Sequence, residues 1–205
     1  MMCGLFGFIG HSVDQALLEH LAVLAGRRGP HASGWAWWRH DKLEIRRQEG
    51  SSERNAGKLP RDATVLIGHS RLCTSGAFDD LSSAQPILVE GLAFAHNGVA
   101  RTRIPPPDCE TTCDSEALAR IAAAESGSLA DKLSAAVDSL DPETPFAIVA
   151  ASDEGIAAAR RGLPLFVNET LGGAYLCSVA TNGAHALQEE TISSWLLPRE
   201  ARDGR

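Results

Sequence analysis

A thiol lies close to the amino terminus, in the run Met1-Met2-Cys3-Gly4-Leu5-Phe6-Gly7. If the residues before Cys3 are removed, this thiol stands beside a free α-amino group. A thiol with a pKa of about 8.5 needs a proton acceptor at neutral pH, and an α-amine with a pKa of about 7.7 to 8.0 can supply one. Cys3 is therefore a candidate nucleophile with its own base. The alternative is a cysteine that serves only as a small hydrophobic residue on a buried first strand.

Other polar residues that could act with this thiol have ordinary interpretations when each is taken alone. Asn97-Gly98 is a strong signal for a two-residue hairpin turn. Arg71 follows an apolar run and fits a surface arginine at the end of a strand. Asp114 precedes a helical pattern and fits a helix cap. No single one of these residues identifies a site.

The elements that must position these residues follow from the apolar periodicity. Gly4 to Gly10 predicts a first strand whose glycines allow close backbone approach. A helix is expected over 13–25, with Ser12 as its cap and Gly26 at its end. Further strands are expected over 34–38, 43–47, 64–70, 92–96, 145–151, 156–160, 165–168 and 174–180, and further helices over 115–124, 128–140 and 183–188. Strands, then helices, then strands predict an α+β fold.

Composition places the chain among ordinary single domains. It has 205 residues, 44% hydrophobic and 22% charged, which suits one domain over 1–198 and a frayed tail over 199–205. No apolar run approaches the roughly 20 residues that span a bilayer, so we expect a cytoplasmic protein that does not bind a membrane. The net charge of −7 argues against nucleic-acid binding, and the doublets Arg27-Arg28 and Arg46-Arg47 are expected to be solvated.

The cysteine content argues against a disulfide framework. The chain has 5 cysteines, an odd number, which suits a reducing compartment. Cys109 and Cys113 could in principle hold a metal with help from a histidine, but no second paired motif completes four ligands. We therefore expect no metal and no organic cofactor.

Four segments in a fixed order carry a resemblance to a known family. They are Met2-Cys3-Gly4-Leu5-Phe6-Gly7, Arg27-Arg28-Gly29-Pro30-His31-Ala32-Ser33-Gly34, Gly68-His69-Ser70-Arg71-Leu72-Cys73-Thr74-Ser75-Gly76 and Ala95-His96-Asn97-Gly98. Together they resemble the glutaminase domain of the class II glutamine amidotransferases, which are N-terminal nucleophile hydrolases. The resemblance continues through Asp114-Ser115-Glu116 and covers nearly the whole chain. It implies a four-layer αββα sandwich of two mainly antiparallel sheets flanked by helices.

The resemblance also implies a role for each matching residue. Cys3 would attack the side-chain amide of glutamine and form a γ-glutamyl thioester. Asn97 and Gly98 would form the oxyanion hole. Three residues would bind the substrate: Arg71 at the α-carboxylate, Asp114 at the α-ammonium group and Thr74 at the wall of the pocket.

The biological role is open at this stage among three hypotheses. The leading one is a standalone glutaminase subunit that passes ammonia to a separate synthase or ligase. A second is a hydrolase of a γ-glutamyl amide in a biosynthetic pathway. A third is a catalytically silent subunit that senses glutamine, in which Met1-Met2 persist before Cys3. Met2 is bulky and disfavours removal of Met1, so exposure of Cys3 requires translation from Met2 or processing in two steps.

Two departures from the family pattern bear on the substrate loop. His31 replaces the aspartate that many relatives carry after Arg-Gly-Pro, and Ser75 stands where some sugar-synthase relatives have histidine. These departures leave the nucleophile and the oxyanion residues intact.

Overall fold

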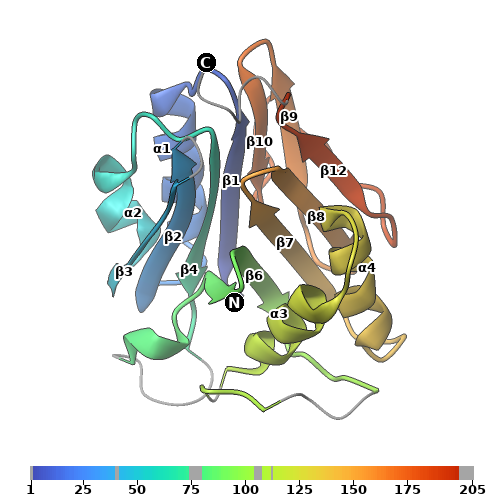
Figure 1. The fold of residues 1–205 in the computed structure, drawn as a ribbon. Coiled ribbons are helices and arrows are strands. Elements are labelled where there is room, and N and C mark those ends of the chain that lie inside the picture. Colours follow the sequence, from blue (N-terminus) through green and yellow to red (C-terminus); the bar gives the residue numbers. More distant parts are fainter. Residues whose placement is uncertain (1, 40–41, 74–79, 104–107, 112, 199–205) are drawn as a thin grey trace.

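Two antiparallel sheets form the centre of the molecule (Figure 1). The computed structural model describes residues 2–39, 42–73, 80–103, 108–111 and 113–198. The first sheet has seven strands in the order β11-β9-β10-β1-β4-β2-β3, and the second has five in the order β12-β8-β7-β6-β5.

The strands of the first sheet are β1 (Gly4–Gly10), β2 (Ala32–Arg39), β3 (Lys42–Glu49), β4 (Val65–Arg71), β9 (Phe166–Thr170), β10 (Gly173–Cys177) and β11 (His185–Ala186). Those of the second sheet are β5 (Ile87–Val89), β6 (Leu92–Gly98), β7 (Phe146–Ser152), β8 (Gly155–Arg161) and β12 (Ser193–Leu196). The helices are α1 (Gln15–Gly26), α2 (Ser52–Asn55), α3 (Asp114–Ala124) and α4 (Leu129–Ser139), with the short 3-10 turns η1 (Ala56–Lys58) and η2 (Leu81–Ser83).

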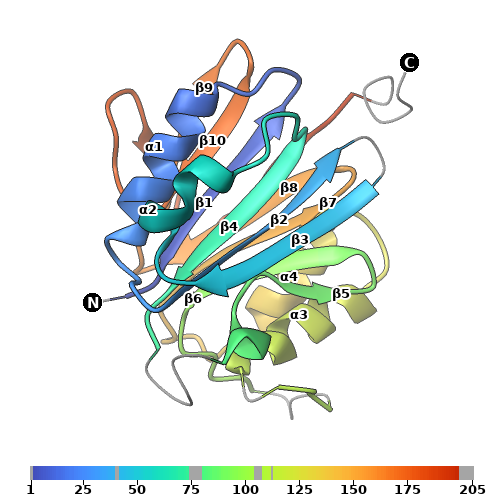
Figure 2. The same cartoon turned by 90° about the vertical axis from the view of Figure 1, so that its left-hand side faces the viewer.

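Helices cover the outer face of each sheet, so the fold has four layers (Figures 1 and 2). Three separate apolar cores hold these layers together. One core joins α1 to the first sheet, one lies between the two sheets, and one joins α3 and α4 to the second sheet. This arrangement confirms the predicted α+β fold and the αββα sandwich.

Successive side chains of the central strand β1 contribute alternately to two of these cores. Leu5 and Ile9 face the second sheet, whereas Phe6 and Phe8 face α1. Successive side chains of a strand point to opposite faces, and every residue of β1 is buried. A strand buried on both faces holds the residue before it, Cys3, in a fixed place.

The structure corrects some of the predicted elements. The cap of α1 is Asp14, whose side chain accepts a hydrogen bond from the Leu17 backbone, and not Ser12. The helix expected over 183–188 is wrong, because His185 and Ala186 pair with β9 instead. The short strands β5 and β12 and the helix α2 were missed, since each is too brief to show a period. The tail over 199–205 lies outside the described residues.

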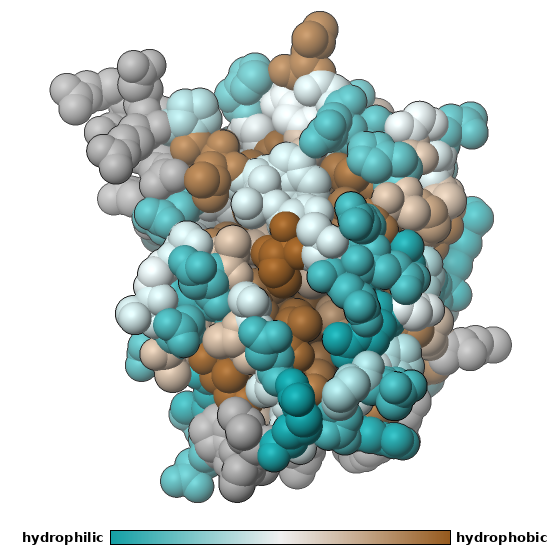
Figure 3. Space-filling view, turned by 90° about the vertical axis from the view of Figure 1, so that its right-hand side faces the viewer, coloured by the Kyte–Doolittle hydropathy of each residue, from teal (hydrophilic) through white to brown (hydrophobic). Residues whose placement is uncertain are grey.

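Apolar side chains also reach the surface. Figure 3 shows a hydrophobic band down the middle of one face of the molecule, with hydrophilic side chains on both sides of it. Leu171 in the β9–β10 turn and Leu196 on β12 are among the large exposed apolar residues. None of the helices in the described ranges is long and apolar enough to cross a membrane.

Gly4 provides a test of the packing that fixes the start of β1. A Cβ atom at this position would lie 2.1 Å from the carbonyl oxygen of Ala25 at the end of α1. The change Gly4→Ala must therefore separate α1 from β1, and we expect it to lower the free energy of unfolding by about 3 kcal/mol or more. Urea unfolding followed by circular dichroism measures this.

Gly57→Ala is the matched control, because a Cβ atom there meets nothing within 4 Å. It should leave stability unchanged or raise it by up to about 1 kcal/mol. Equal effects of the two variants would contradict the close-approach argument.

Candidate active site

Cys3 lies at one end of the sandwich, next to the end of β4. Gly4 pairs with Ser70, which brings the thiol beside Leu72. The sulfur accepts a hydrogen bond from the Leu72 backbone N–H at 3.3 Å. Burial raises the pKa of the Cys3 thiol, and this outweighs the lowering effects of the Leu72 hydrogen bond and the Arg71 charge. A thiol in this state is protonated at neutral pH and requires a base to become a nucleophile.

The backbone carbonyl of Cys3 accepts hydrogen bonds from two distant side chains. Asn97 donates from Nδ2 at 2.9 Å, and Arg28 donates from Nε at 3.0 Å. Arg28 also donates from Nη1 to the Ser178 carbonyl at 2.8 Å. The prediction that the Arg27-Arg28 doublet is solvated is therefore wrong for Arg28. The sequence feature that could have identified Arg28 is its position directly before Gly29-Pro30, in the second of the four segments that carry the resemblance.

Asn97 and Gly98 end strand β6 and do not form a hairpin turn. They pair with Ala147 and Phe146 of the neighbouring strand. Gly98 has φ 137°, and a Cβ atom there would lie 2.7 Å from both His96 Nε2 and the Pro145 carbonyl oxygen. A side chain at this position is therefore excluded, and the positive φ also favours glycine.

A cavity of about 380 Å³ brings the predicted residues together. Cys3, Arg71, Gly98 and Asp114 all contribute to its wall. Asn97 is not part of this wall, but its side chain donates a hydrogen bond to the backbone carbonyl of Cys3. The cavity therefore contains a thiol, a cation and a carboxylate. Thr74 lies outside the described residues.

The two charged residues of this cavity are held by backbone contacts. Arg71 ends β4, and its Nη1 donates to the Asp80 carbonyl at 3.2 Å. Asp114 is the first residue of α3, and its Oδ2 accepts a hydrogen bond from the Ala100 backbone at 2.6 Å. The helix cap is Cys113, so the simple interpretation of Asp114 as a cap is wrong. Arg71 lines a cavity and is not merely a surface residue.

His31 is joined to the segment that follows Arg71. Its Nδ1 accepts a hydrogen bond from the Cys73 backbone at 2.8 Å, and its own backbone N–H donates to the Arg71 carbonyl at 3.1 Å. The side chain and the backbone of His31 therefore both hold this segment in place.

A buried polar network supports the Gly98 end of β6. His96 Nδ1 lies 3.0 Å from Ser115 Oγ, and Gln85 Nε2 donates to the same oxygen at 3.0 Å. Gln85 Oε1 also accepts from the His96 backbone at 2.6 Å. Because Ser115 adjoins Asp114, the network links the start of α3 to the strand that carries Asn97 and Gly98.

Two histidines of this region are neutral because they are buried. Burial lowers the pKa of His69 to about 3, and the Arg71 charge, together with repulsion from His96 once that residue is protonated in acid, lowers it further. Burial lowers the pKa of His96 to about 4 against an opposing effect of Asp114. Neither imidazole carries a charge at neutral pH.

In the part of the chain that the structure describes, no group of three or more histidine, cysteine, aspartate or glutamate side chains could hold a metal ion. None of the five cysteines, all of which lie within the described ranges, forms a disulfide.

The depressed histidine pKa values predict a loss of stability in mild acid. Unfolded histidine takes up a proton below a pKa of about 6.5, whereas His69 and His96 stay neutral in the folded state until much lower pH. The unfolded state then binds more protons, so the free energy of unfolding falls as pH falls from about 6.5 to about 4. We expect a loss on the order of 2 kcal/mol per histidine at pH 5.

Urea unfolding at pH 7 and pH 5 measures the loss. An NMR titration of the imidazole carbons gives an independent measurement, in which two histidines should not titrate between pH 7.5 and 5. Titration of all seven histidines near pH 6.5 would contradict the burial argument.

Sequence comparison finds relatives among enzymes that use glutamine. The chain matches no protein-family model. It is 31% identical over 194 residues to glutamine–fructose-6-phosphate aminotransferase (isomerizing) of Mesorhizobium japonicum, a match that covers 87% of this chain and 32% of that protein. It is 38% identical over 106 residues to amidophosphoribosyltransferase of Pseudomonas aeruginosa, covering 47% of this chain and 20% of that protein. The chain thus spans about a third or less of these relatives.

Solved structures share the fold. Glutamine phosphoribosylpyrophosphate amidotransferase from B. subtilis superposes with a TM-score of 0.70 at 20% identity, over 95% of this chain and 49% of that one. A glutamine aminotransferase class-II domain protein from Silicibacter pomeroyi gives a TM-score of 0.61 at 12% identity, over 95% of this chain and 99% of that one. At these identities the likeness concerns the fold alone.

Proposed function

Because the chain is a class II glutamine amidotransferase domain with the fold of the N-terminal nucleophile hydrolases, we propose that it hydrolyses the side-chain amide of L-glutamine to glutamate and ammonia. The observation that supports this most directly is the single cavity lined by Cys3, Arg71, Gly98 and Asp114. A thiol, a backbone amide at the cavity wall and two opposite charges suit hydrolysis of an amide on a free amino acid.

The two charged residues select a substrate that has a free α-carboxylate and a free α-ammonium group. The planar guanidinium of Arg71 binds both oxygens of the α-carboxylate, and the Asp114 carboxylate binds the α-ammonium group. A glutamine inside a peptide has neither group. The hydrogen bonds of Arg71 to Asp80 and of Asp114 to Ala100 hold these two side chains in place before the substrate arrives.

Acylation begins when the free α-amine of Cys3 takes the proton of the thiol. The sulfur attacks the γ-carbonyl carbon, and the negative oxygen is stabilised by Asn97 Nδ2 and the Gly98 N–H. Nδ2 has two hydrogens, so the bond to the Cys3 carbonyl leaves one for the substrate. One such donor typically lowers the activation free energy by about 3 to 4 kcal/mol.

Collapse of the tetrahedral intermediate breaks the C–N bond. The α-ammonium group of Cys3 returns the proton to the departing nitrogen, which leaves as ammonia. Water then attacks the thioester through the same oxyanion site, which releases glutamate and restores the thiol.

The ammonia requires an acceptor. We infer that residues 1–198 form one glutaminase domain and that a synthase or ligase takes up the ammonia. The relative from Mesorhizobium japonicum supports this, because its name describes transfer of an amino group from glutamine to fructose 6-phosphate. The five cysteines form no disulfide, which fits a protein of the reducing cytoplasm.

Exposure of the Cys3 amine provides the first test. Protein that begins at Cys3 should release glutamate from glutamine, whereas protein that retains Met2 has an amide nitrogen in place of the base and should be inactive. Intact mass and a glutamate assay on the same samples measure both. Turnover by protein that retains Met2 would contradict the role of the amine. Inactive protein that begins at Cys3 would favour the silent glutamine-sensing subunit.

Two substitutions separate the nucleophile from the oxyanion site. Cys3→Ala should abolish turnover and keep glutamine binding measurable by calorimetry. Asn97→Ala should lower kcat by about 100-fold to 1000-fold with a smaller change in KM, because its donor acts mainly in the transition state. The exposed Cys109 gives a matched control, since Cys109→Ala removes a thiol that does not line the cavity. Residual activity in Cys3→Ala would refute the mechanism.

A further inference from the structure

His31 joins the start of β2 to the end of β4. Its imidazole Nδ1 accepts a hydrogen bond from the Cys73 backbone N–H at 2.8 Å, and its backbone N–H donates to the Arg71 carbonyl at 3.1 Å. The His31 carbonyl accepts a hydrogen bond at 2.9 Å from the N–H of Gly50, the residue that follows β3. One residue therefore binds the segment 71–73 at both of its ends and is itself held beside the end of β3.

The segment 71–73 runs past the end of the sheet. The pairing of β2 with β4 ends at Ala32 and Arg71, and the pairing of β1 with β4 ends at Gly4 and Ser70. Cys73 follows both of these ladders, so the imidazole of a side chain accepts the hydrogen bond of its N–H where a strand neighbour would do so inside the sheet.

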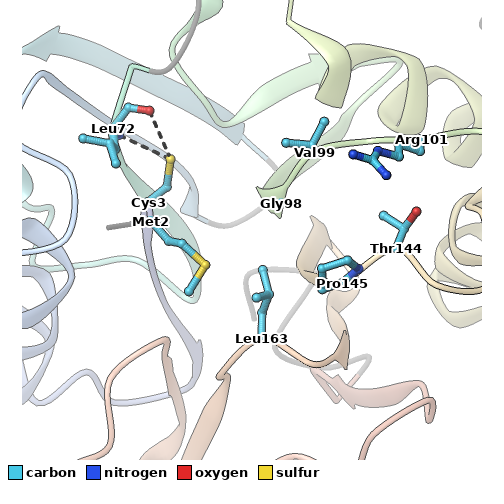
Figure 4. Close-up of a pocket in the computed structure, with 9 residues that line it drawn as sticks. All are labelled: Met2, Cys3, Leu72, Gly98, Val99, Arg101, Thr144, Pro145 and Leu163. Carbon is cyan, nitrogen blue, oxygen red and sulfur yellow. Dashed lines mark hydrogen bonds between the residues drawn. The ribbon is translucent and has the colours of Figure 1, made fainter.

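This segment carries two groups of the proposed active site. The Leu72 backbone N–H donates to Cys3 Sγ at 3.3 Å (Figure 4). The Arg71 side chain lines the cavity that also contains Asp114. The position of the segment therefore affects both the thiol and the cation that is proposed to bind the substrate.

A second cavity meets the first at the thiol. It has a volume of about 360 Å³, and its wall includes Val99, Leu163 and Arg101 (Figure 4). Leu72 belongs to the walls of both cavities, whereas His31 belongs to neither. An effect of His31 on the reaction therefore passes through the segment that it holds.

The bond from Cys73 determines which side chains can replace the imidazole. A backbone N–H only donates, so Nδ1 of His31 must be the unprotonated nitrogen of the ring. The side-chain oxygen of asparagine is bonded to Cγ, as Nδ1 is, and it also accepts hydrogen bonds. Leucine has a similar size and has no acceptor. Substitutions at this position can therefore keep or remove the acceptor at nearly constant size.

From this geometry we propose that His31 is a positioning residue for glutamine binding, and that its Nδ1 holds the segment 71–73 where the Arg71 guanidinium meets the α-carboxylate. The proposal rests on the proposed hydrolysis of glutamine and adds a residue that touches neither the substrate nor the thiol. Without the acceptor the segment is held less firmly at Cys73. Arg71 then binds the carboxylate less tightly, because ordering a looser side chain costs free energy on binding.

The experiment measures glutamate release from glutamine by protein that begins at Cys3. His31→Leu should raise KM by about 10-fold, as expected for loss of one hydrogen-bond partner, and should change kcat by less than about 3-fold. His31→Asn restores an acceptor and should keep KM within about 2-fold of the parent value. His20→Leu is the matched control, because His20 is an exposed residue of α1 that lines neither cavity, and it should leave KM unchanged.

A double-mutant cycle tests whether His31 acts through Arg71. His31→Leu should lower kcat/KM by about 10-fold in the parent protein and by less than about 2-fold in protein that already carries Arg71→Met. Equal effects in the two backgrounds would show a structural role that is independent of Arg71, and they would overturn the proposal.

The outcomes also separate this proposal from the one on which it rests. If His31→Leu does not fold by circular dichroism, His31→Gln takes its place in both measurements, because its amide oxygen lies one bond further from the backbone than Nδ1 does. An unchanged KM without the acceptor, or an equal rise of KM in His31→Asn, overturns the role of Nδ1 and leaves the glutaminase standing. Absence of glutamate release by the parent protein overturns both proposals.

Discussion

The backbone carbonyl of Cys3 is the point on which the geometry of the site depends. It accepts hydrogen bonds from Arg28, which follows α1, and from Asn97, which belongs to the second sheet. A carbonyl oxygen with two donors of this kind fixes the strand end in both directions. The thiol is therefore held between the two sheets by contacts that reach residues remote in the sequence.

Close approach of the two sheets makes these contacts possible. The core between the sheets contains many alanines on β6, β7 and β8 facing larger residues of β1 and β4. Small side chains let the strands lie near one another, and the polar ends of β4 and β6 then meet beside Cys3. His69 and His96 are buried there as neutral imidazoles, so the site tolerates polar groups at the expense of stability in acid.

The same arrangement separates two chemical environments on either side of the sulfur. Arg71 and Asp114 give one cavity opposite charges, whereas Val99, Leu163 and Arg101 give the other an apolar surface with one cation. The residues proposed to bind the α-carboxylate and α-ammonium groups of the substrate thus line only one of the two cavities.

Local sequence pattern determined the strands, the main helices and the identity of the candidate nucleophile. Alternation and helical periodicity act over a few residues, so β1, α3 and α4 were predictable, and the order of the motifs pointed to the family. The short strands β11 and β12, the contact of Arg28 with Cys3 and the second cavity were not predictable. They depend on residues that lie about 18 or more positions apart in the chain. Only tertiary packing decides which of these meet, because hydrogen bonding and burial act on distance in space and not on distance along the sequence.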